Sequence, residues 1–221
     1  FFFKQKTAYE IRNCDWSSDM CSSDLVKFEA DDGLAAGVAL AAADARVAQV
    51  RILSPDKDMG QCVDGNRVVQ FDRRNDTIIN EDAVREKFGV GPESIADWLG
   101  LVGDTADGFP GLPGWGAKSA SAVLAVYRHI EDIPDDEARW AADGVTVRGA
   151  AKLAATLRDN RDDAALFKRI ATVATDVSED LDIGAVDDWE WRGVSGQLGK
   201  VARELGMPDV VERAERIMLT R

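Results

Sequence analysis

The spacing of apolar residues divides the chain after residue 25 into a part with mixed helix and strand patterns and a part with helical patterns alone. In the mixed part, an alanine-rich stretch with helical spacing begins after Phe28 and runs to about Ala45. Asn80 predicts a helix to about Phe88, because its side chain can accept a hydrogen bond from the first turn. Short apolar runs predict a buried strand at Val47–Leu53 and further strands at Arg67–Phe71 and Thr77–Ile79.

Only helices are expected after about residue 104. Pro92 opens a helix whose apolar residues keep helical spacing until Gly103 ends it. The stretch VDDWEWRG at 186–193 fits either a local strand or a turn. Further helices are predicted at Lys118–Tyr127, around Trp140, at Gly149–Arg158, at Ala164–Ile170, at Val194–Leu205 and from Pro208 to the end.

The first 25 residues differ in character from the rest of the chain. They contain Cys14 and Cys21, begin with three phenylalanines, and show neither helical nor strand periodicity. A secretory signal needs a basic start before its apolar run, which this segment lacks. We interpret residues 1–25 as non-native sequence joined to the protein, with a disordered native tail as the alternative.

The overall composition predicts a globular protein of the cytoplasm. The 221 residues are 45% hydrophobic, which is enough for a packed core, and no run approaches the ~20 apolar residues of a membrane helix. Three cysteines are too few for a disulfide framework. Because His129 is the only histidine, a site built on several histidines is excluded. A net charge of -13 argues at first against a DNA partner.

Three groups of acidic residues lie where a strand ends or a helix begins. Asp56 and Asp58 follow the first predicted strand. Asp104 and Asp107 are three residues apart, so a helical turn would place both on one face. Taken singly, such acids are often helix caps or turn formers. Taken together, carboxylates without histidine or cysteine suit Mg²⁺ or Mn²⁺. The seven are Glu29, Asp31, Asp32, Asp56, Asp58, Asp104 and Asp107.

The glycine-rich stretch GFPGLPGWGAKSA, residues 108–120, predicts a helical hairpin that binds phosphate. It misses the nucleotide-binding pattern by one residue, since Ala117 separates Gly116 from Lys118, and no strand precedes it. Backbone N–H groups at a helix start bind phosphate without reading bases. A plain connector is the alternative, and Trp115 is expected to pack on the hairpin rather than stack on a base. The candidate DNA contacts are Lys57, Gly111, Gly114, Gly116, Lys118 and Ser119.

With EADD at 29–32, SPDKDMGQ at 54–61 and GDTADGFPGLPGWGAKSA at 103–120, in this order, the chain resembles the bacterial 5′-3′ exonuclease family. That family includes the 5′ nuclease domain of DNA polymerase I and the flap endonucleases. The resemblance implies an α/β, PIN-like (Rossmann-like) nuclease core, here partial, followed by an all-helical helix-three-turn-helix (SAM-like) domain. We expect residues 26–102 to form the core part and residues 103–221 the helical DNA-binding domain.

The resemblance also implies a function. The seven acids match the family's metal-site acids, which bind two divalent ions and hydrolyse DNA at a 5′ end or flap by a two-metal mechanism. The hairpin matches the phosphate-binding turn, where the family commonly also holds K⁺ through backbone carbonyls. The expected partner of this monomer is double-stranded or branched DNA. Further candidates for a local basic face are Arg73, Arg74 and Arg128, although taken singly each is better explained as a solvated surface charge.

The chain departs from the family pattern at its start. In the family, about a hundred residues precede EADD and supply another metal-binding aspartate and a basic arch, and neither is found before Phe28. We therefore expect the C-terminal two-thirds of a stand-alone 5′ nuclease, with an incomplete metal site and reduced activity. Two alternatives are a non-catalytic duplex-binding module and a small metal-dependent ribonuclease, and the glycine hairpin argues against the second.

Overall fold

The computed structural model describes residues 28–178, 182–190, 193–207 and 209–219. The segment 1–25, interpreted above as non-native, lies outside the described residues. Two compact units are distinguished, residues 1–183 and 184–221, and each is described by itself. No helix of the described residues is both long and apolar enough to cross a membrane.

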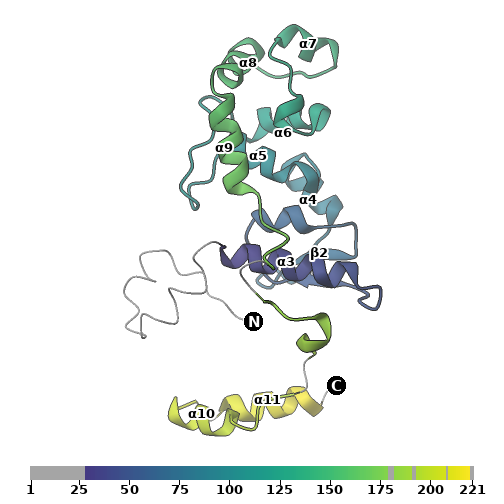
Figure 1. The fold of residues 1–221 in the computed structure, drawn as a ribbon, viewed down its shortest axis with the longest axis vertical. Coiled ribbons are helices and arrows are strands. Elements are labelled where there is room, and N and C mark those ends of the chain that lie inside the picture. Colours follow the sequence, from purple (N-terminus) through teal and green to yellow (C-terminus); the bar gives the residue numbers. More distant parts are fainter. Residues whose placement is uncertain (1–27, 179–181, 191–192, 208, 220–221) are drawn as a thin grey trace. The chain divides into compact units, whose positions relative to one another are not determined.

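The first unit begins with an α/β layer, drawn in purple and blue in Figure 1. Helix α3 (Ala30–Ala43) is followed by β1 (Val50–Ile52), the short 3-10 helix η1 (Asp58–Cys62), β2 (Val68–Asp72) and β3 (Thr77–Ile79). The sheet order is β1-β2-β3, with β1 parallel to β2 and β2 antiparallel to β3. A small core of Ala35, Ile52, Met59 and Val68 joins α3 and η1 to the sheet.

The predicted buried strand Val47–Leu53 is only partly correct. The observed strand β1 is limited to Val50–Ile52, and only Ile52 of its three residues is buried. Leu53 is 60% exposed. The reason is that β1 lies at one edge of the three described strands, so an apolar run here does not mean burial on every side.

The helical part of the first unit has its own, larger core. Helix α4 begins after the Asn80 cap, whose side chain accepts a hydrogen bond from the Ala83 N–H, and α5 ends at Gly103 as predicted. Helices α5 and α9 pack against each other, as Figure 1 shows. The helices are α4 (Glu81–Phe88), η2 (Pro92–Ser94), α5 (Ile95–Val102), α6 (Ala117–Tyr127), η3 (Ile130–Asp132), α7 (Glu137–Ala142), α8 (Ala150–Asp159) and α9 (Arg161–Ala171).

The second unit contains η4 (Val186–Trp189), α10 (Leu198–Glu204) and α11 (Asp209–Leu219). The 3-10 turn η4 resolves the choice between strand and turn for the described part of the VDDWEWRG stretch. Helix α10 is shorter than the predicted Val194–Leu205. After residue 104 the described chain forms no strand, and the isolated bridge between Asp104 and Phe109 is its one paired β contact.

Candidate metal centre

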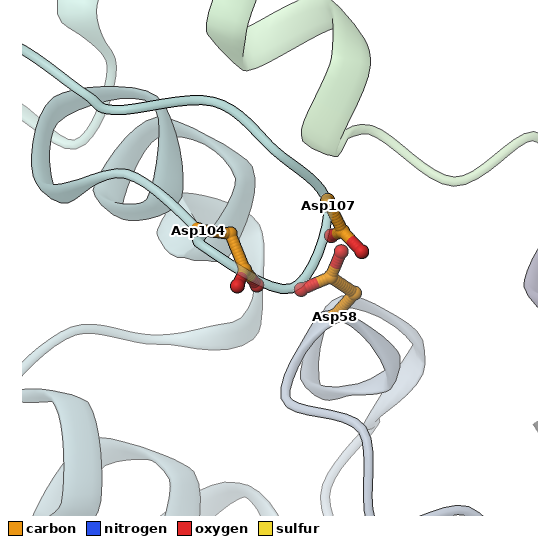
Figure 2. Close-up of side chains that lie close together, drawn as sticks. All are labelled: Asp58, Asp104 and Asp107. Atoms are coloured by element: carbon orange, nitrogen blue, oxygen red, sulfur yellow. The ribbon is translucent and has the colours of Figure 1, made fainter. Parts of the chain in front are cut away.

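Three of the predicted acids meet at one point of the first unit. Each of Asp58, Asp104 and Asp107 offers a carboxylate oxygen, and these oxygens lie within 4.8 Å of one another. Figure 2 shows Asp58 at the start of η1 facing the turn that carries the other two. Asp58 and Asp104, which are 46 positions apart in the sequence, therefore lie at one point.

The turn that follows α5 presents Asp104 and Asp107, but it is not the helical turn that their spacing predicts. The Asp104 and Phe109 backbones exchange two hydrogen bonds of 2.9 and 3.0 Å, which close a hairpin-like turn. The Asp104 carboxylate also accepts a 2.9 Å hydrogen bond from the Ala106 N–H. The helix cannot continue into this turn because Gly103 has a positive φ of 89° and ends α5.

The carboxylate of Asp58 is buried and incompletely satisfied. Its side chain is 7% exposed, and Oδ1 has no hydrogen-bond partner among the described residues. Burial, the charge of Asp56 and a hydrogen bond shared with Asp107 raise the pKa of Asp58, and burial and Asp104 raise the pKa of Asp107. A buried, unpartnered carboxylate oxygen among other carboxylates is the environment that a hard divalent cation satisfies, so these residues fit such an ion.

Asp31 and Asp56 extend the negative field of this cluster. Burial and the charges of Asp56, Glu29 and Asp107 raise the pKa of Asp31 to about 6. The loop that carries Asp56 is fixed by the Gln70 side chain, which donates a 2.7 Å hydrogen bond to the Asp56 carbonyl oxygen. Sequence reasoning missed Gln70, although a polar residue inside the apolar stretch VVQF was a usable signal.

The predicted metal ligand Asp32 accepts two hydrogen bonds from backbone N–H groups. Its Oδ2 accepts a 2.9 Å hydrogen bond from the Glu29 N–H, which caps the start of α3, and its Oδ1 accepts a 2.6 Å hydrogen bond from the Ala174 N–H. Each carboxylate oxygen therefore accepts one hydrogen bond from the backbone. Glu29, by contrast, is the exposed residue that precedes α3 and contributes its charge to the field around Asp31.

Lys57, a predicted DNA contact, forms an ion pair with an acid of the cluster. Its ammonium lies 2.5 Å from Asp104 Oδ2, and the two side chains are 33% and 4% exposed. The lysine thus balances the charge of an acid of the cluster. Arg73 and Arg74 lie in the turn between β2 and β3, and Arg128 follows α6.

The glycine-rich hairpin is held by two glycines that lie backbone against backbone. A Cβ atom added at Gly103 would lie 2.4 Å from the carbonyl of Pro110, and one at Gly111 would lie 2.4 Å from the Gly103 nitrogen. Both glycines have positive φ, 89° and 68°. The hairpin therefore crosses the end of α5 at a distance that no side chain permits.

The remaining hairpin residues divide into a buried and an open set. Trp115 is 7% exposed and donates to the Leu153 carbonyl oxygen, which confirms that it packs in the core rather than stacking on a base. The Ser119 hydroxyl bonds to both the N–H and the carbonyl of Gly116, so it closes the turn. A Cβ atom at Gly114 or Gly116 would meet nothing within 4 Å, and Lys118 is exposed in the first turn of α6.

Solved structures share this combination of an α/β layer and a helical domain. A structure of the T5 5′-exonuclease with bound zinc matches at a TM-score of 0.52 and 20% identity, over 65% of this chain and 49% of that one. The T5 D15 protein co-crystallized with metal ions matches at a TM-score of 0.53 and 20% identity, over 65% of this chain and 50% of that one. A T5 flap endonuclease in complex with DNA and metal ions matches at 0.52 and 19% identity, over 65% and 49%. The fold is therefore that of a 5′ nuclease.

Sequence comparisons identify the family. The model of the 5′-3′ exonuclease N-terminal resolvase-like domain matches residues 11–89, and the model of the C-terminal SAM fold matches residues 90–195. DNA polymerase I of Pseudomonas aeruginosa is 37% identical over 163 residues, which are 70% of this chain and 16% of that protein. A 5′-3′ exonuclease of Buchnera aphidicola is 32% identical over 133 residues, 60% of this chain and 46% of that one. The chain belongs to the 5′-3′ exonuclease family.

The chain spans less than half the length of these two curated relatives. The two matched ranges meet at residues 89 and 90, and the first begins at residue 11, inside the segment interpreted as non-native. The domain limits 26–102 and 103–221, and the origin of residues 1–25, stay predictions.

Proposed function

We propose that this chain is the metal-binding and DNA-binding part of a 5′ nuclease that hydrolyses DNA phosphodiesters at 5′ ends or flaps. The observation that carries the proposal is the meeting of Asp58, Asp104 and Asp107, with carboxylate oxygens within 4.8 Å of one another. Family membership supports the same activity. The runner-up is a non-catalytic module that binds duplex DNA through the hairpin alone.

The acids that we assign to divalent cations, Mg²⁺ or Mn²⁺, surround the unpartnered Oδ1 of Asp58. When bound, two such ions supply Lewis-acid stabilisation of the phosphodiester and a water of lowered pKa. The protein's own contribution is to hold the carboxylates in one place: η1 fixes Asp58, the Asp104–Phe109 bridge fixes the second pair, and Gln70 fixes the Asp56 loop. The proposed ligands are Glu29, Asp31, Asp56, Asp58, Asp104 and Asp107.

The hairpin supplies the DNA contact in this proposal. The backbone around Gly114 and Gly116 is open to a phosphate, because these positions have no atoms within 4 Å of an added Cβ. Lys118 adds a positive charge beside the N-terminus of α6. We extend the proposal to a K⁺ ion on hairpin carbonyls, so DNA affinity is expected to be higher in KCl than in NaCl of equal concentration.

This arrangement reconciles a net charge of -13 with a DNA substrate. Cations between the carboxylates neutralise the negative field where the phosphodiester must lie. Backbone N–H groups and a single lysine need no broadly basic surface to bind a phosphate. One chain supplies both the acids and the hairpin, so we propose a monomer, which light scattering after size exclusion can check.

The test combines cleavage, metal binding and DNA binding, because the chain spans only part of its relatives. A 5′-labelled flap duplex is incubated with the full chain in Mg²⁺ or EDTA. We expect Mg²⁺-dependent release of the flap, abolished in Asp58→Asn and kept in Asp159→Asn, which changes an exposed acid outside the cluster. DNA binding by anisotropy should persist in Asp58→Asn and weaken in Lys118→Ala. Binding without any Mg²⁺-dependent cleavage, unchanged by Asp58→Asn, would favour the non-catalytic module.

A further inference from the structure

The chain that leaves α9 returns to the α/β layer, as Figure 1 shows for the green segment below α9. We call residues Thr172–Val177 the return segment. Val173 packs against the small core formed by residues such as Ile52 and Met59, and Val177 is 2% exposed. This segment therefore belongs to the packing of the α/β layer although it follows the helical part in sequence.

Polar contacts tie the end of α9 and the return segment to two acid-bearing elements. The Gln61 side chain, in the η1 turn that begins with Asp58, donates a 2.7 Å hydrogen bond to the Ala171 carbonyl oxygen. The Ala174 N–H donates a 2.6 Å hydrogen bond to Asp32 Oδ1, on the first turn of α3. The second contact is charge-assisted, which makes it stronger than a hydrogen bond between neutral groups.

The third acid-bearing element contacts α9 through rings. Phe109, which closes the turn that carries Asp104 and Asp107, stacks on Phe167 of α9 with centroids 5.8 Å apart. Three elements that are distant in sequence thus make contact with one continuous piece of chain, from Phe167 to Ala174. The capping of α3 alone does not require a charged side chain at Asp32, because uncharged polar residues also cap helix starts.

We propose that Asp32 is a positioning residue, which fastens the first turn of α3 to the return segment and so aligns Glu29 and Asp31 with the acids of η1 and of the Asp104–Phe109 turn. This inference rests on the proposed function, because it concerns the geometry of the same cation site. It assigns Asp32 to backbone N–H groups instead of to a metal ion. The charge of the carboxylate is used to accept two hydrogen bonds at once.

Two variants separate positioning from direct ligation. Asp32→Asn keeps one acceptor oxygen and loses the other, whereas Ala174→Pro removes the donor and leaves every carboxylate in place. If Asp32 acts through Ala174, both variants lower the Mn²⁺ affinity measured by calorimetry by about tenfold, with the number of bound ions unchanged. Loss of one Mn²⁺ equivalent in Asp32→Asn, with normal binding in Ala174→Pro, would overturn the proposal.

Hydrogen exchange of the metal-free full chain provides a readout that depends on neither metal nor DNA. We expect amide exchange in residues 172–177 to rise about tenfold in Asp32→Asn, as the loss of about 1.4 kcal/mol of local protection requires. Unchanged exchange there would refute the contact even if Ala174→Pro does not fold. Absence of Mn²⁺ binding in the unmodified chain, with the exchange effect intact, would refute the proposed function and leave the fastening role of Asp32 standing.

Discussion

The ammonium of Lys57 lies 2.5 Å from the carboxylate of Asp104, one of the least exposed acids among the described residues. In the absence of metal this ion pair compensates a buried charge. Removing one partner of a fully buried pair costs about 3 kcal/mol, and the partial exposure of Lys57 reduces that figure. We expect Lys57→Met to lower the free energy of unfolding by about 1–2 kcal/mol in EDTA.

Urea unfolding in EDTA and in saturating Mg²⁺ checks this expectation. A bound cation offers Asp104 another positive charge, so the difference between Lys57→Met and the unmodified chain should shrink in Mg²⁺. Arg158→Met is a matched control, because its exposed pair with Asp159 contributes little. An equal loss of stability with and without Mg²⁺ would show that Asp104 does not face a cation.

The acid cluster predicts an unusual pH dependence. Burial raises the pKa of Asp31 from 3.8 to about 6, and burial also raises the pKa values of Asp58 and Asp107. A raised pKa means that the folded state binds the proton more tightly than the unfolded state, so stability falls as pH rises above 3.8 through the raised value. We expect the Tm in EDTA to be lower at about pH 7.5 than at about pH 5.

Calorimetry at constant ionic strength measures this effect. The lowered pKa values of Asp44 and Asp72 do not interfere, because their contributions are lost only as pH falls below about 4. Mg²⁺ should raise the Tm more at the higher pH, since protons compete for the same oxygens. A flat Tm in EDTA, or an equal slope in Asp58→Asn, would argue against a shared cluster.

The contact of Gly103 with Gly111 predicts a large stability effect. A Cβ atom added at either glycine would lie 2.4 Å from backbone atoms of the segment that contains the other glycine. Both residues also have positive φ. We expect Gly103→Ala or Gly111→Ala to lower the free energy of unfolding by more than about 3 kcal/mol. Chemical denaturation measures this change in the free energy of unfolding. A loss below about 1 kcal/mol would mean that the two backbone segments can move apart at little energetic cost.

Gly114 allows DNA binding to be separated from stability. Gly114 and Gly144 have φ values of 84° and 88° and open space around an added Cβ, so alanine at either should cost about 1 kcal/mol of stability. Only Gly114 lies in the proposed phosphate-binding hairpin. We expect Gly114→Ala to weaken binding of a flap duplex several-fold more than Gly144→Ala in fluorescence anisotropy. Equal affinities would place the phosphate contact elsewhere.

Substitution of the buried Asp97 is expected to change the stability of the chain. Its 1% exposed carboxylate pairs with Lys168 at 2.8 Å and His129 at 3.0 Å, and it accepts a 2.8 Å hydrogen bond from the Ile130 N–H. Asp97→Ala should destabilise the chain by about 3 kcal/mol, because it leaves the Lys168 charge and a buried N–H without this partner. Glu131→Gln, which changes the exposed partner of Lys168, should cost under about 1 kcal/mol in the same urea titration.

Local chemistry allowed much of the fold to be predicted from the sequence. The Asn80 cap and Gly103 set helix limits through contacts within a few residues, and the strand Thr77–Ile79 was predicted residue by residue. The edge position of β1 was not predictable, because an apolar run carries no information about which strands pair with it. The 3-10 form of η4 likewise depends on turn geometry, which the alternation of apolar and polar residues does not encode.

The candidate site was predictable in its residue types and less so in their roles. Motif order singled out Asp58, Asp104 and Asp107, which the fold brings together. A motif does not reveal that Asp32 accepts a hydrogen bond from the Ala174 N–H or that Lys57 pairs with Asp104, and the roles predicted for both residues stay predictions. Such partners come from tertiary contacts, which a single sequence does not display.

The contact between Asp32 and Ala174 joins residues 142 positions apart. A ribosome must therefore complete the helical part before the first turn of α3 can be fastened. Contacts of such long separation carry a large loop-closure entropy and form late in folding. During synthesis, the acidic residues near the start of the described chain are thus exposed as separate charges long before they can join the proposed cation site.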